Sequence, residues 1–87
     1  MSYKFNFRQN QLANMYIDIM LDCGYHSIQV ADYDVYKQYR SRGVRELRKV
    51  DWFDGCRILV SGYDELGNRG VFTSRGHFYN YDERAVL

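Results

Sequence analysis

This chain contains four side chains of the types that bind zinc: Cys23, His26, Cys56 and His77. Cys23 and His26 have the spacing of one half of a zinc site, but Cys56 and His77 are too far apart to form a second half. Two cysteines are also too few for a disulfide framework. We therefore expect buried cysteine thiols with no disulfide, no bound metal and no cofactor.

Two pairs of carboxylates have a spacing found in magnesium-dependent nucleases, Asp32 with Asp34 and Asp51 with Asp54. Neither pair comes with the further acid, lysine or histidine that would define a two-metal site. Asp32 is instead a suitable N-cap for a helix that begins at Tyr33, and the other pair brackets a predicted turn. The sequence therefore predicts structural roles for these acids.

A third set of residues has side chains that act as acids, bases or phosphate ligands in enzymes: Arg57, Arg69, Arg75, His77, Tyr79 and Tyr81. All lie on or beside strands predicted in the C-terminal half. Helices on an antiparallel sheet with such residues resemble the small RelE-type RNA-cleaving toxins, although those begin with a strand and this chain begins with a helix. The resemblance implies RNA cleavage, which we keep as the last of three interpretations, after protein binding and nucleic-acid binding.

Tyrosines and arginines alternate at near-helical spacing in residues 32–49. Tyrosine supplies a rigid amphipathic ring and arginine a planar fork of five donors, so both are frequent where proteins meet proteins or nucleic acids. We predict that this stretch is the partner-binding surface. The predicted contact residues are Tyr33, Tyr36, Tyr39, Arg40, Arg42, Arg45 and Arg48.

The same stretch also has a nucleic-acid interpretation, our second alternative. Its arginines and Lys49 would contact phosphates while its tyrosines stack on unpaired bases. The chain as a whole carries a formal net charge of only +1, with 12 basic and 11 acidic residues, so we expect no strong general attraction to nucleic acid or anionic membrane. The charge is local instead, since acids gather elsewhere, at Asp64, Glu65, Asp82 and Glu83.

The length and composition predict one globular domain, residues 1–87, because 46% of the residues are hydrophobic and 26% are charged. There is no apolar run of membrane-spanning length and no signal-peptide pattern. We expect a cytoplasmic protein, in the cytoplasm of the host cell if a phage encodes it. The oligomeric state stays open, a homodimer included.

An amphipathic helix is predicted over residues 6–23. Its apolar face contains Tyr16, Ile19 and Met20, Asn6 with Gln9 forms a capping-box pattern, and glycine follows the last turn. A second helical region begins at Tyr33 and meets Gly43, where we favour a break or kink over one helix that continues through the glycine. The spacing of Val44, Leu47 and Val50 predicts that a helix resumes after the break.

Period-two patterns after Cys56 predict three strands, over residues 57–61, 70–73 and 77–81, joined by short turns. Residues 27–30 alternate in the same way but are too few to assign. Trp52 and Phe53 are expected to close the core. The predicted fold class is α+β, with the amphipathic helix and the broken helical region packed on a C-terminal three-stranded antiparallel β-meander.

Aromatic content favours binding over catalysis. Fifteen of the 87 residues are Phe, Trp or Tyr, more than so small a core can hide. In size, composition and its Met1-Ser2-Tyr3-Lys4 start, the chain resembles small phage-encoded proteins such as the anti-CRISPR inhibitors. The resemblance implies a non-enzymatic inhibitor that binds a host protein or nucleoprotein defence complex and blocks its nucleic-acid binding or its nuclease.

Overall fold

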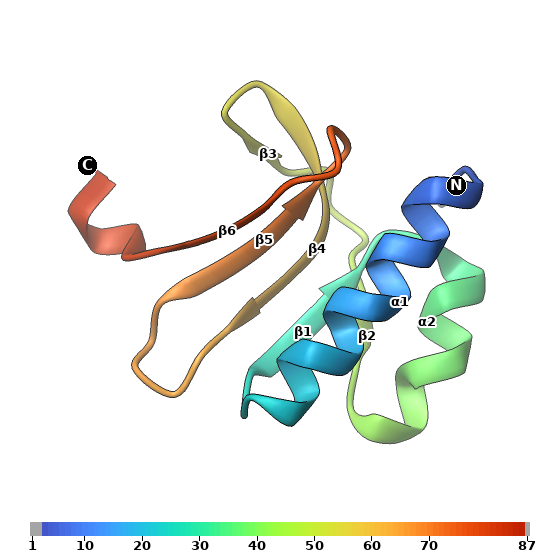
Figure 1. The fold of residues 1–87 in the computed structure, drawn as a ribbon, viewed down its shortest axis with the longest axis horizontal. Coiled ribbons are helices and arrows are strands. Elements are labelled where there is room, and N and C mark those ends of the chain that lie inside the picture. Colours follow the sequence, from blue (N-terminus) through green and yellow to red (C-terminus); the bar gives the residue numbers. More distant parts are fainter. Residues whose placement is uncertain (1–2, 87) are drawn as a thin grey trace.

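The computed structural model describes residues 3–86, which form six strands and four helical segments. In chain order these are α1 (Phe7–Asp22), β1 (His26–Val30), α2 (Tyr33–Tyr39), η1 (Arg40–Arg42), β2 (Arg45–Glu46), β3 (Trp52–Phe53), β4 (Cys56–Tyr63), β5 (Arg69–Thr73), β6 (Phe78–Tyr81) and η2 (Glu83–Val86) (Figure 1). The elements α1 and α2 are α-helices, and η1 and η2 are 3-10 helices. The predicted α+β class is confirmed.

The strands form a mixed sheet in the order β2-β1-β4-β5-β6, and β3 pairs with β4 outside this path. The antiparallel meander β4-β5-β6 is present as predicted. The prediction that the sheet consists only of this C-terminal meander is wrong. β1 adds antiparallel to β4, and β2 adds parallel to β1 at the edge, so the N-terminal half of the chain supplies part of the sheet.

The predicted helix after Gly43 is also wrong. Gly43 has a φ of 90°, and this left-handed conformation ends the 3-10 turn and redirects the chain. Arg45 and Glu46 then pair with Gln29 and Val30 of β1. An apolar residue at every third position fits a short helix or an irregular edge strand equally well, and the free backbone groups of β1 decide between them. The break at Gly43 itself was predicted correctly.

The predicted start signals of both α-helices are present. Asn6 Oδ1 accepts from the backbone N–H of Gln9 at 2.8 Å, and Gln9 Oε1 accepts from that of Asn6 at 3.1 Å. The buried carboxylate of Asp32 caps α2 by accepting from the N–H of Val35 at 3.0 Å. It also accepts from the N–H of Phe5 at 2.8 Å, which fastens the N-terminal segment to α2.

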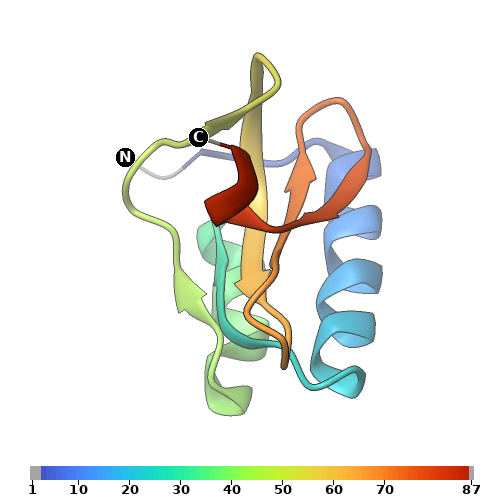
Figure 2. The ribbon, with the colours of Figure 1, turned by 90° about the vertical axis from the view of Figure 1, so that its left-hand side faces the viewer.

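Both α-helices pack on one face of the sheet, side by side in Figure 1. The core between the two layers contains Ala13, Ile17 and Met20 of α1, whereas Ile19 is 47% exposed, so the buried stripe is rotated from the predicted one. Figure 2 turns the other face of the sheet toward the viewer, with η2 in front of the strands. Buried residues lie on that face too, among them Ile58 and Val71.

Trp52 does not close the core as predicted. It lies in β3, which is part of a hairpin that leaves the sheet, and Trp52 is 61% exposed. The expectation of buried thiols is wrong for Cys23, which is exposed just after α1, and Cys56 is half-buried. Both cysteines are free. Within residues 3–86 no helix is long and apolar enough to cross a membrane.

Candidate partner-binding cleft

A cleft of about 640 Å³ lies where α2, η1 and β2 follow one another at the β2 edge of the sheet. We call it the arginine cleft. It brings together four of the seven residues predicted from the sequence, Tyr36, Arg40, Arg45 and Arg48. The remaining lining residues are Gln29, Gly43, Val44 and Glu46.

The turn at Gly43 builds this cleft. Arg40 follows the last residue of α2, and Gly43 reverses the chain so that Arg45 returns beside β1. Val44, which is 2% exposed, packs into the core and anchors the turn to it. Arg40 and Arg45 therefore precede and follow one anchored turn, and both residues are exposed.

The electrostatics of the cleft favour an anionic ligand. In the described part of the chain, Arg40 and Arg45 form no ion pair. Arg48 lies 3.5 Å from Glu46, and its side chain is 87% exposed, so this pair adds little stability. Three guanidinium groups against one carboxylate leave donors for a carboxylate or phosphate from outside.

Tyr33 flanks the cleft without lining it. Its ring is 5.9 Å from that of Tyr36, and the ammonium group of Lys37 lies 5.3 Å from its centroid. Tyr33 is 46% exposed, so it offers a ring face next to the arginines. The two tyrosines form a short aromatic shelf along α2.

Tyr39 and Arg42 lie outside the cleft. Tyr39 is 8% exposed, and its hydroxyl donates to the carbonyl of Asn14 at 3.2 Å. Burial, with Asp18 nearby, raises the pKa of Tyr39 to about 12, although Arg42 opposes this shift. Arg42 lies 3.5 Å from Asp18 on α1. The structure thus gives both residues a role in holding the cleft against α1.

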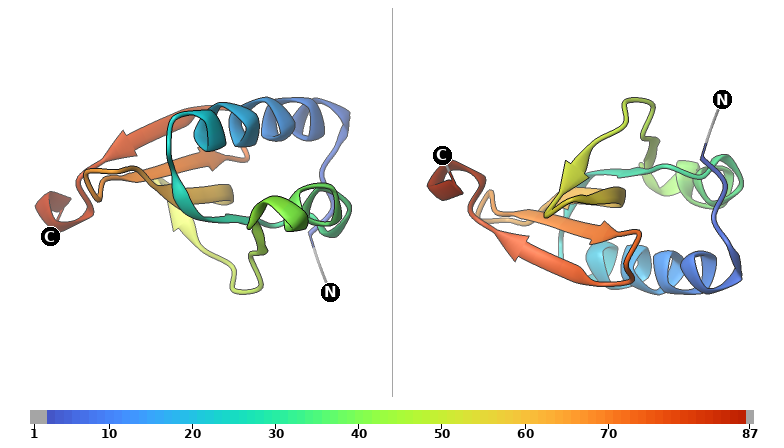
Figure 3. Two further views of the ribbon diagram at one scale, coloured as in Figure 1. Left: turned by 90° about the horizontal axis from the view of Figure 1, so that it is seen from below. Right: turned by 90° about the horizontal axis from the view of Figure 1, so that it is seen from above.

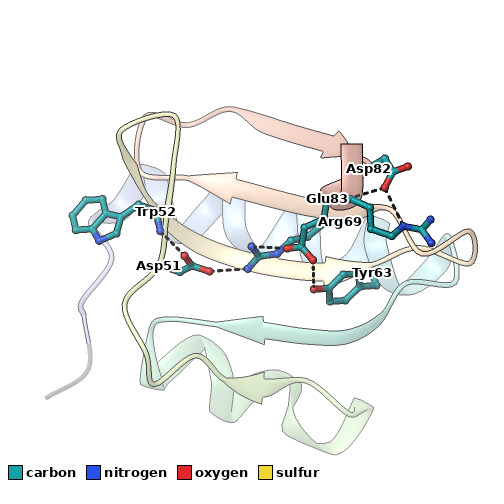
Figure 4. A network of polar contacts seen from close by, with 7 residues as sticks. Asp51, Trp52, Tyr63, Arg69, Asp82 and Glu83 are labelled. Carbon is teal, nitrogen blue, oxygen red and sulfur yellow. Dashed lines mark hydrogen bonds and ion pairs between the residues drawn. The ribbon is translucent and has the colours of Figure 1, made fainter. Parts of the chain in front are cut away.

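Sequence reasoning missed a second polar cluster, on the sheet face away from the helices (Figure 4). The guanidinium of Arg69 is 3.0 Å from Asp51 and 3.4 Å from Glu83, and the hydroxyl of Tyr63 donates to Glu83 at 3.1 Å. We call these four residues the Arg69 network. A single arginine in an otherwise apolar strand was the available signal, since such a residue needs acidic partners.

The ion pair between Arg69 and Asp51 shifts the pKa values of both groups in the directions expected for paired charges. Burial alone would lower the pKa of Arg69, but hydrogen bonds with Asp51 and Tyr81 raise it overall. Burial likewise opposes ionisation of Asp51, yet the N–H of Trp52 and the Arg69 guanidinium keep the pKa of Asp51 below its usual value. Arg69 is therefore engaged within the fold.

Comparison with known proteins identifies no relative. No family model matches the chain, and no match was found among curated proteins or solved structures. In residues 3–86 no three His, Cys, Asp or Glu side chains are grouped to hold a metal ion. The interpretation of the site depends on its own geometry.

Proposed function

We propose that this chain is a non-enzymatic binding protein whose arginine cleft receives an acidic patch of a partner protein. We further propose that it acts as an inhibitor of the anti-CRISPR kind, which blocks nucleic-acid binding or nuclease activity of a host defence complex. The observation that carries the proposal is the cleft itself, where Arg40 and Arg45, which form no ion pair within residues 3–86, lie beside Tyr36.

A protein partner fits this cleft better than a nucleic-acid strand. The cleft is an open hollow whose lining includes the carboxylate of Glu46, whereas a strand of phosphates favours a continuous basic groove without acidic residues. The net charge of +1 supplies little long-range attraction. Arginine and tyrosine in a shaped pocket are the residues that contribute most to protein interfaces.

The inhibitor proposal is tested by phage plaquing. Expression of the chain in a host with an active CRISPR system should raise the plaquing efficiency of a targeted phage. The Arg40→Glu/Arg45→Glu variant should lose this effect, because reversed charge repels an acidic patch. Arg84→Glu is the matched control, since Arg84 is exposed and belongs to η2, which lies at the opposite end of the molecule from α2 (Figure 3). Protection by the double variant equal to that of the wild type would refute the role of the cleft.

Direct nucleic-acid binding is the second candidate, and the aromatic shelf favours it. Tyr33 and Tyr36 present rings next to the cleft arginines, an arrangement that suits stacked bases with bound phosphates. This candidate predicts binding of fluorescent single-stranded RNA that weakens steeply with salt. Our first proposal predicts no such binding at physiological salt.

A further inference from the structure

A second hollow, of about 550 Å³, lies on the hairpin and strands near the other edge of the sheet. We call it the aromatic groove. It is lined by Trp52, Phe53, Asp54, Tyr79 and Tyr81. None of these residues belongs to the arginine cleft, so the groove is an independent site.

The rings of the groove are held in place before any ligand arrives. The ring of Phe53 is 4.8 Å from that of Tyr79 and 4.8 Å from that of Tyr81. Backbone pairing fixes them, since Phe53 pairs with Cys56 of β4 and the two tyrosines pair with residues of β5. Trp52, 61% exposed, adds an accessible aromatic residue to the lining. A preformed site of this kind binds without the loss of side-chain freedom.

Asp54 supplies the charge of the groove. The other lining residues are aromatic, so Asp54 is the one charged residue of the lining at neutral pH. Within residues 3–86 it forms no ion pair. Its φ is 52° and that of Gly55 is 74°, as in a two-residue hairpin turn, so the backbone of Asp54 is fixed in the turn, and its side chain is exposed. An unpaired carboxylate beside aromatic rings attracts cations and repels phosphates.

We propose that the aromatic groove binds a cationic side chain, arginine or lysine, from an extended basic segment of a partner protein. The ring faces carry the negative part of the aromatic quadrupole, and Asp54 adds a full negative charge. β6 is the last strand on its side of the described sheet, so an extended segment can lie along it with alternate side chains above Tyr79 and Tyr81. The groove thus selects the opposite charge from the arginine cleft.

The probe is a synthetic peptide of alternating serine and arginine, compared with the same peptide in which citrulline, neutral and isosteric, replaces arginine. Titration calorimetry gives the affinity, and the fluorescence of Trp52, the only tryptophan, reports on the groove. The arginine peptide should bind saturably, and the citrulline peptide should bind at least about tenfold more weakly.

Two variants assign the binding to this groove. Asp54→Asn keeps the turn and removes the charge, and Tyr81→Leu keeps apolar volume and removes the ring. Each should weaken the arginine peptide by about fivefold or more. Glu65→Gln, which removes an exposed carboxylate in the turn between β4 and β5, outside both the groove and the arginine cleft, should leave the affinity unchanged.

Several outcomes would overturn the proposal. These are equal affinity for the citrulline peptide, no saturable binding of the arginine peptide, or unchanged binding by Asp54→Asn with its fold intact by circular dichroism. Saturable binding of a single-stranded oligonucleotide that Tyr81→Leu abolishes would also overturn it, because the groove would then recognise bases.

Discussion

At the scale of single residues, Tyr39 joins the candidate site to the core. Its folded-state pKa of about 12 lies above the usual tyrosine value near 10, so the folded state keeps the proton longer than the unfolded state. The free energy of unfolding is therefore unaffected below about pH 10 and falls as the pH rises from there toward 12.

Tyr39→Phe should remove much of this alkaline loss of stability. Urea unfolding between pH 8 and pH 11.5 measures it, as the slope of the unfolding free energy against pH. Tyr33→Phe, on the exposed side of α2, is the control and should keep the wild-type slope. A wild-type slope in Tyr39→Phe would contradict this account of the buried hydroxyl.

The loss of Arg69 should destabilise the fold. Arg69→Met leaves the carboxylates of Asp51 and Glu83 without their partner; because both carboxylates are 47% exposed and stay partly solvated, we expect a loss of roughly 1–2 kcal/mol in stability. Arg84→Met removes an exposed pair with Asp82 and should cost less than about 1 kcal/mol. Denaturant unfolding compares the two, and similar losses would show that the Arg69 network is not structural.

At the scale of elements, the turn at Gly43 sets the geometry of the arginine cleft. A Cβ at Gly43 would meet no atom within 4 Å, so Gly43→Ala should cost only the backbone strain of a φ of 90°, about 1 kcal/mol. Gly67→Ala, with a φ of 84° and equally open space, should cost about the same.

Only Gly43→Ala should also weaken partner binding, because relaxation of this turn changes the position of Arg40 relative to Arg45. Paired measurements of unfolding free energy and of binding by biolayer interferometry separate the two effects. Equal binding by both alanine variants would mean that the turn does not position the contact residues.

The elements that the sequence predicted well have local signals. The Asn6 capping box, the Asp32 cap and the turns of the meander each involve residues a few positions apart. The alternation within β1 was too short to assign a strand, and β2 had no such signal. The pairing of β1 with β2 and with β4 depends on long-range contacts that periodicity does not report. Four predicted contact residues converge, since they flank one turn, but the burial of Tyr39 depends on α1 and was not visible in spacing.

At the scale of the whole molecule, the 12 basic and 11 acidic residues nearly cancel in number but are unevenly distributed. The arginine cleft lies at the β2 edge of the sheet, and the aromatic groove with Asp54 lies toward the β6 edge. Figure 3 places α2 and η2 at opposite ends of the molecule. A chain with two sites of opposite preference can orient itself on a partner that carries both acidic and basic patches.

The most direct test of the central claim is the affinity of the captured partner for variants of the cleft. The partner is first identified by affinity capture from host lysate with quantitative mass spectrometry and is then purified. Arg40→Ala/Arg45→Ala should bind it at least about tenfold more weakly than the wild type, while the control Arg8→Ala/Arg84→Ala should bind equally well. Wild-type affinity in the cleft variant, with its fold intact, would contradict the claim that the arginine cleft is the binding surface.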